Sequence, residues 1–291
     1  MTGSTKPQAG GKTPADLDIQ PRDMSFGRDA PGDRWWLGGD PVATAFYNAL
    51  SATFPLGERF FMDAVRRYRS AAPKALQAQI NAFLAQEAMH TREHIFFNKQ
   101  IADHGYDIAR MELRTRERLE YARSRPALQQ LGATIALEHF TAILAHALLA
   151  DPRHLEGASV EAKAMWRWHA IEEIEHKAVA YDTFMVAAAG LPGWRRWTLR
   201  AMTMVVATQF LFAVVGANMA DLYAADGLRN GATWRKTLRF LLVRPGMLTQ
   251  VLGAYFAYFL PGFHPWSHDN RALVKEVEQS LEAAYAQGAP A

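Results

Sequence analysis

The sequence of 291 residues contains no cysteine. This absence excludes disulfide scaffolds, thiolate zinc sites, iron–sulfur clusters and a cysteine nucleophile. Carboxylates and the imidazoles of 10 histidines are therefore the strong metal ligands that remain. The chain also lacks a marked excess of charge, since 32 basic residues face 29 acidic ones. Such a balance argues against nucleic acid as a partner.

The first 33 residues lack the apolar run of a signal peptide and are rich in Pro, Gly, Thr and charged residues. This composition predicts a flexible N-terminal arm over residues 1–33. Without a signal peptide, the expected location of the protein is the cytoplasm.

From Asp40-Pro41 onward the sequence is typical of helices, because a capping residue followed by proline marks a helix start. Proline and glycine then punctuate the chain at regular intervals, and no alternating strand pattern interrupts it. Further helices are predicted over residues 73–105, 107–125, 126–151 and 159–190. We therefore expect an all-α fold, a ferritin-like four-helix bundle with additional C-terminal helices. This domain would cover residues 40–263, with a C-terminal helix and tail over 264–291.

The helix predicted over 73–105 carries Glu87, His90 and His94. At about 100° per residue these three side chains fall within about 60° of one another, on one face. The helix predicted over 159–190 repeats the pattern with similar spacing, in its residues His169, Glu173 and His176, with Glu172 at the edge of the arc. Glu-x-x-His thus occurs on two separate helices.

Two further carboxylates stand among apolar residues. Glu58 lies within FPLGERFF, and Glu138 shares a helical stripe with Leu131, Ile135 and Ala142. A carboxylate that points into a core without a partner is costly, and a cation is the usual remedy. Taken alone, Glu58 could instead pair with an arginine, and Glu138 could instead lie on the surface of its helix.

Taken together, the order Glu, Glu-x-x-His, Glu, Glu-x-x-His is the ligand set of a carboxylate-bridged dinuclear metal centre. Carboxylates bridge two hard cations, and neutral imidazoles cap each one without adding charge. We predict two iron ions, with manganese or zinc as alternatives. His94 and Glu172 are interpreted as additional ligands or as supporting residues behind the ligands.

Four segments resemble a bacterial family described as predicted metal-dependent hydrolases, a ferritin-like group: FPLGERFFMDAVR, FLAQEAMHTREH, ALEHFTA and WHAIEEIEHKAVAYD. The resemblance covers about residues 40–260. The spacing His169-x-x-x-Glu173-x-x-His176 is also similar to the last metal-binding helix of di-iron arylamine N-oxygenases, of the p-aminobenzoate N-oxygenase type. This second resemblance implies a third histidine ligand and the full set Glu58, Glu87, His90, Glu138, His169, Glu173 and His176.

The function that these features favour is an O2-activating oxygenase or oxidase that acts on a small apolar or amine substrate. Such an enzyme would take O2 as a co-substrate and an electron-donor protein as a partner. The alternative is a metal-dependent hydrolase in which the paired ions generate hydroxide. A non-catalytic iron-binding protein is the third hypothesis, and a homodimer is compatible with all three.

Residues 201–220 contain no charged side chain and follow Arg195, Arg196 and Arg200. This length reaches the minimum for a membrane span, and the arginines stand where anionic lipid head groups would meet them. The competing interpretation is a helix that closes one side of the bundle and lines an apolar channel to the metals. Both interpretations favour an apolar substrate.

Overall fold

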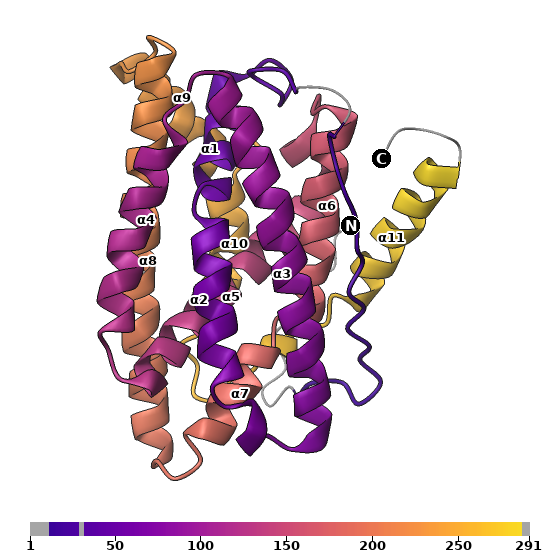
Figure 1. Ribbon diagram of the computed structural model, residues 1–291, viewed down its shortest axis with the longest axis vertical. Helices are drawn as coiled ribbons and strands as arrows, with labels where there is room; N and C mark the ends of the chain where they lie inside the picture. The colour runs from indigo at the N-terminus through magenta and orange to yellow at the C-terminus, as the bar shows by residue number, and fades with distance from the viewer. Residues whose placement is uncertain (1–11, 29–31, 287–291) are drawn as a thin grey trace.

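The computed structural model describes residues 12–28 and 32–286, and this part of the chain is all-α (Figure 1). Its helices are α1 (Pro41–Ser51), α2 (Phe54–Arg66), α3 (Lys74–Asp103), α4 (Ile108–Arg123), α5 (Ala127–Ala150), α6 (Val160–His176), α7 (Val179–Ala187), α8 (Gly193–Ala225), α9 (Gly231–Leu242), α10 (Met247–Ala257) and α11 (Arg271–Ala286). The all-α prediction is confirmed.

Local signals in the sequence explain where most of these helices begin. The carboxylate of Asp40 accepts hydrogen bonds from the amides of Val42 and Ala43, and Pro41 occupies the first turn of α1. Ser159 caps α6 in the same way. Each cap satisfies amide groups that a helix N-terminus leaves free. Pro55 stands in the first turn of α2, where its missing amide costs nothing, and so separates α2 from α1.

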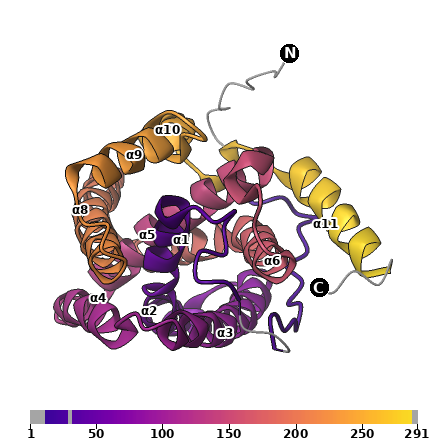
Figure 2. The ribbon, with the colours of Figure 1, turned by 90° about the horizontal axis from the view of Figure 1, so that it is seen from above.

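Four helices surround the interior where the predicted ligands lie. α2 packs on α3 and α5 packs on α6, while contacts between α2 and α5 and between α3 and α6 join the two pairs. Figure 2 shows these helices end-on, with α4 and α8 outside them on one side and α11 on the other. The more specific expectation, a ferritin-like four-helix bundle, remains a prediction.

The helix predicted over 159–190 is in fact two helices, α6 and α7, which are separated by Lys177 and Ala178. No proline or glycine marks this break in the sequence. The ammonium group of Lys177 is buried and donates hydrogen bonds to the carbonyl of His268 and the side chain of Asn270. A contact with a distant segment, rather than a local signal, therefore accompanies the break.

The segment of residues 12–28 differs from the expected flexible arm because it packs along the bundle. Ile19 and Phe26 are buried. The guanidinium of Arg22 forms ion pairs with Glu172 and Glu175 of α6 and with Glu278 of α11. Residues 1–11 and 29–31 of the predicted arm, and 287–291 of the predicted tail, lie outside the described residues.

Two described helices, α5 and α8, are long and apolar enough to cross a membrane by length and composition, and the bent pair α9 and α10 is a third candidate. In α5, two thirds of the most apolar 18-residue stretch is buried, so the central place of this helix explains its apolar character. α8 packs on α5 and α1 at the outside of the molecule, and only 28% of its most apolar 18-residue stretch is buried. Its outer face therefore exposes apolar side chains such as Met202, Val205 and Phe212.

Candidate metal centre

Seven buried side chains from α2, α3, α5 and α6 meet in the interior of the molecule. They form three overlapping groups in which one nitrogen or oxygen atom of each residue lies within 4.8 Å of the others: Glu58 with His90 and His169, Glu87 with His90 and Glu173, and Glu87 with Glu138 and His176. The structure thus brings together all seven residues of the predicted ligand set, and each is at most 4% exposed.

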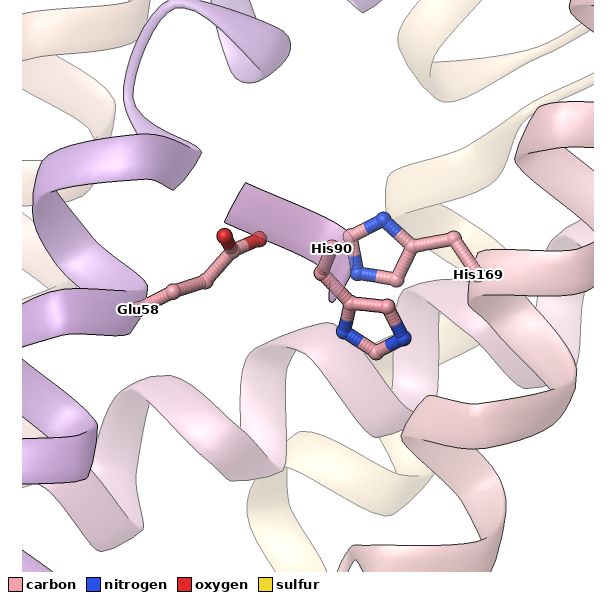
Figure 3. A group of neighbouring side chains, drawn as sticks. All are labelled: Glu58, His90 and His169. Atoms are coloured by element: carbon pink, nitrogen blue, oxygen red, sulfur yellow. The ribbon is translucent and has the colours of Figure 1, made fainter. Parts of the chain in front are cut away.

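Helix geometry explains how four of these side chains reach the same space. Glu87 and His90 lie one turn apart on α3, and Glu173 and His176 lie one turn apart on α6. Residues three apart share a helix face, so each helix presents one carboxylate and one imidazole. From α2, the carboxylate of Glu58 points toward the imidazole rings of His90 and His169 (Figure 3).

Eight nitrogen and oxygen atoms of the cluster have no hydrogen-bond partner among the described residues. They are Glu58 Oε1, both carboxylate oxygens of Glu87 and of Glu138, Glu173 Oε2, His90 Nδ1 and His176 Nε2. Leaving one buried polar atom unpaired costs about 1–3 kcal/mol, and proteins rarely tolerate several in one place. The residues therefore fit metal ions, which would satisfy these atoms together.

The distances between donor atoms agree with this interpretation. His176 Nε2 lies 3.2 Å from Glu87 Oε1, 3.5 Å from Glu138 Oε2 and 3.5 Å from Glu173 Oε2. Metal–ligand bonds of nitrogen and oxygen are about 2.0–2.2 Å long, so donors about 3–4 Å apart can share one ion.

Without a cation the cluster must hold protons to limit its negative charge. Burial and the neighbouring carboxylate of Glu87 raise the pKa values of Glu58 and Glu138. Burial acts in the opposite direction on His90, but the adjacent carboxylates of Glu172 and Glu173 outweigh it and raise its pKa to about 10. Metal binding must therefore displace protons from this cluster.

The imidazole of His169 has a pKa that burial, together with the nearby His90, lowers to about 4. It therefore stays neutral, as a metal-binding imidazole must. Its Nδ1 lies 2.6 Å from His94 Nε2, and His94 Nδ1 lies 2.8 Å from Ser51 Oγ. The Ser51 hydroxyl donates its proton to Asn98 Oδ1, so Ser51 Oγ accepts a hydrogen bond from His94 Nδ1. His94 Nε2 then carries no proton and acts as the acceptor toward His169. Because His169 Nδ1 donates to His94, His169 Nε2 carries no proton, and its lone pair, 2.8 Å from Glu173 Oε1, is available to a metal.

His94 and Glu172, predicted as additional ligands or supporting residues, lie outside the three metal-binding groups. Both ring nitrogens of His94 are occupied by His169 and Ser51. The Glu172 carboxylate accepts a hydrogen bond from His90 Nε2 at 3.0 Å and another from the backbone amide of Arg22 at 2.9 Å. Both residues therefore orient ligand imidazoles, a role that commonly changes metal affinity by about 10–100-fold.

Besides Arg22, sequence reasoning missed three residues that support the cluster. His176 Nδ1 donates to Gln86 Oε1 at 2.9 Å, and Gln86 Nε2 in turn donates to Glu175. The Thr91 hydroxyl donates to Glu58 Oε2 at 2.8 Å. Gln86 and Thr91 stand next to the predicted ligands Glu87 and His90 in the chain, which was the available signal. Ser51 has no such signal, because only the packing of α1 brings it to His94.

Aromatic rings enclose the cluster and limit the access of water. The Phe54 ring lies 4.7 Å from the His94 ring and 5.1 Å from the His169 ring, measured between centroids. Phe83 covers His176 at 4.9 Å, and Trp168 covers His90 at 5.0 Å. Charges in such a dry site interact more strongly than in water.

A cavity of about 650 Å³ lies between α2, α4, α5 and α8, and most of its walls are apolar. Its lining includes Phe54 and Gly57, which precede Glu58 on α2, and Leu137 and Thr141, which flank Glu138 in the sequence of α5. Its volume falls within the range of about 300–1,000 Å³ that is typical of small-molecule sites. Residues of α8 line the cavity, as the channel interpretation of residues 201–220 expects, while membrane contact remains a prediction.

A family model described as "predicted metal-dependent hydrolase" matches residues 20–269. The chain belongs to this family. The match includes the whole cluster and also Arg22, which supports it from the N-terminal segment. No curated protein and no solved structure gave a match. The family description supports a metal-dependent enzyme, and it favours the hydrolase alternative over the oxygenase hypothesis; the similarity to arylamine N-oxygenases stays a prediction.

Proposed function

We propose that the protein is a hydrolase with a dinuclear metal centre that acts on an apolar substrate. The observation that carries this proposal is the set of eight buried ligand atoms without hydrogen-bond partners. Membership of the metal-dependent hydrolase family supports the reaction class. The metal could be zinc, manganese or iron, because carboxylates and imidazoles bind all three.

The arrangement of the groups supports two ions rather than one. The group of Glu58, His90 and His169 shares no residue with the group of Glu87, Glu138 and His176. The third group, which includes Glu173, lies between them and overlaps both.

Two carboxylates are placed to bridge these two positions. Glu173 Oε1 lies 2.8 Å from His169 Nε2, whereas its Oε2 lies 3.5 Å from His176 Nε2. Glu87 likewise directs Oε1 to His176, at 3.2 Å, and Oε2 toward His90 Nδ1, at 3.9 Å. Each carboxylate thus has one oxygen toward each of the two groups, so both would help to hold either ion.

When bound, a metal pair supplies a hydroxide nucleophile at neutral pH and polarises the bond that is attacked. The residues of the chain hold the ligand imidazoles in fixed orientations through Glu172, Gln86 and His94. The ion pairs of Arg22 with Glu172 and Glu175 compensate carboxylates close to the centre. Phe54 and Trp168 exclude bulk water and favour apolar substrates.

A second candidate function is oxidation by O2 at a di-iron centre. One observation favours it: all seven ligands lie on helices, and no loop aspartate of the described part of the chain takes part. Carboxylate-rich helical sites of this type occur in di-iron proteins. This function would need an electron-donor protein as a further partner.

The two candidates are separated by the metal and by the need for oxygen. The protein is purified from cells supplied with iron, manganese and zinc, and its metals are measured by mass spectrometry together with hydrolysis of p-nitrophenyl acyl esters under nitrogen. Hydrolysis that chelation abolishes and added metal restores supports the proposal. An iron protein without esterase activity, with absorption that dithionite bleaches and air restores, would favour the second candidate. Tightly bound iron without either behaviour would indicate an iron-binding protein.

A further inference from the structure

The cavity between α2, α4, α5 and α8 combines a mostly apolar wall with three exposed arginines. They are Arg118 and Arg125, from α4 and the turn after it, and Arg195 from the first turn of α8. Among the described residues, no acidic side chain lines the cavity. Apart from these arginines and a few hydroxyl and amide groups, its lining is aliphatic or aromatic.

No carboxylate of the described residues lies within 4.0 Å of these three arginines. On the same helix, Arg114 pairs with Asp221 and Arg123 pairs with Asp63. The guanidinium groups of the cavity instead lie over aromatic rings: Arg118 over Phe210 at 5.2 Å, Arg125 over Tyr121 at 5.8 Å and Arg195 over Trp194 at 5.2 Å. Their positive charge is therefore free to attract an anion to the entrance.

The cavity also reaches the wall of the metal centre. Phe54 lines the cavity and also contacts the rings of His94 and His169, so a single side chain separates the two spaces. Gly57 lines the cavity beside Glu58 and leaves room where other residues would place a side chain. The cavity thus extends from the exposed arginines to one side chain from the metal centre.

We propose that this cavity binds an amphiphile with one anionic head group and a long unbranched hydrocarbon chain. The head group lies among Arg118, Arg125 and Arg195, and the chain extends toward Phe54. This inference goes beyond the proposed function, because it assigns a ligand to the cavity and no reaction to that ligand. A free fatty acid anion and a lysophospholipid share this chemistry.

Binding is measured by calorimetry with the full-length protein and with laurate, lauroyl lysophosphatidate and 1-dodecanol, all below the concentrations at which they form micelles. We expect laurate or the lysolipid to bind at least tenfold more tightly than dodecanol. The double variant Arg118→Gln/Arg125→Gln should weaken binding of the anionic ligands about tenfold and leave dodecanol unchanged, since about 1.4 kcal/mol corresponds to tenfold in affinity. Arg116→Gln is the matched control, because Arg116 is exposed on α4 and does not line the cavity.

A second variant, Ala133→Phe, tests the cavity itself by filling it. It should lower the affinity for all three ligands more than tenfold, and the thermal melting of the variant reports whether the fold is kept. Preference for laurate over the lysolipid would identify free acyl anions as the ligand, and the reverse preference would identify lysolipids. Equal binding of laurate and dodecanol, unchanged laurate binding in the double arginine variant, or no binding of any ligand would overturn the inference. Metal content and ester hydrolysis are measured in the absence of these ligands. A failure of the proposed function is therefore distinguished from a failure of this inference.

Discussion

Replacement of Glu138 by leucine should change the stability of the protein in opposite directions with and without metal. Both carboxylate oxygens of Glu138 are buried and lack hydrogen-bond partners, and the nearest cationic group, His176 Nε2, lies 3.5 Å away. An unpaired buried polar group costs about 1–3 kcal/mol. In the chelated protein, Glu138→Leu removes this cost and should raise the free energy of unfolding by about that amount.

For a protein of this size about 1 kcal/mol shifts the melting temperature by about 2–4 °C, so the gain should be visible in a thermal scan. In the metal-loaded protein the same change removes a ligand, and the melting temperature should fall because less metal binds the folded state. Thermal melting is recorded with chelator and with saturating metal. Glu120→Leu serves as the control, since Glu120 is exposed on α4 and its replacement should stay within about 0.5 kcal/mol in both conditions.

The result that would refute this reasoning is an equal loss of stability with chelator and with metal. Glu138 would then make a stabilising contact of its own in the protein, and the argument from unpaired ligand atoms would fail for this residue.

Three further predictions follow from the same geometry. The affinity for zinc should rise with pH between pH 6 and 8, because the pKa values of Glu58, Glu138 and His90 are raised and the metal must displace their protons. A competition titration with a chelating dye measures this affinity, and an affinity that does not change with pH would contradict the prediction. His94→Ala should keep the fold but lower metal affinity about 10–100-fold, because His169 loses the acceptor that fixes its ring; unchanged affinity by the same dye titration would make His94 purely structural. The apolar outer face of α8 predicts sedimentation with anionic vesicles that persists in high salt; complete recovery in the supernatant at low salt would exclude membrane contact and leave only the role of α8 in lining the cavity.

Local signals were sufficient to predict much of the fold and the membership of the cluster. Asp40-Pro41, Pro73 and Pro126 each precede a helix, as the sequence indicated. The ligand pairs on α3 and α6 were found because a spacing of three residues places two side chains on one helix face. Glu58 and Glu138 were found because a carboxylate within an apolar stripe is costly to bury unless a cation compensates its charge.

The parts that the sequence did not predict depend on contacts between distant residues. Arg22 pairs with Glu172 and Glu175, which lie about 150 residues away, so no local pattern indicates that the N-terminal segment packs on α6. Glu175 points away from the ligand face of α6, and its partners Arg22 and Gln86, which pair with it in a buried site, come from distant parts of the chain. The break after α6 is of the same kind, because it involves Lys177 and a segment near residue 270.

The most direct test of a dinuclear centre is anomalous X-ray diffraction from crystals of the metal-loaded protein, recorded at the absorption edge of the metal. The account predicts two peaks about 3.5–4 Å apart, the usual separation in two-metal sites. One peak should lie among Glu58, His90 and His169, and the other among Glu87, Glu138 and His176. A single peak, or no peak between α2, α3, α5 and α6 in protein that contains metal, would contradict it.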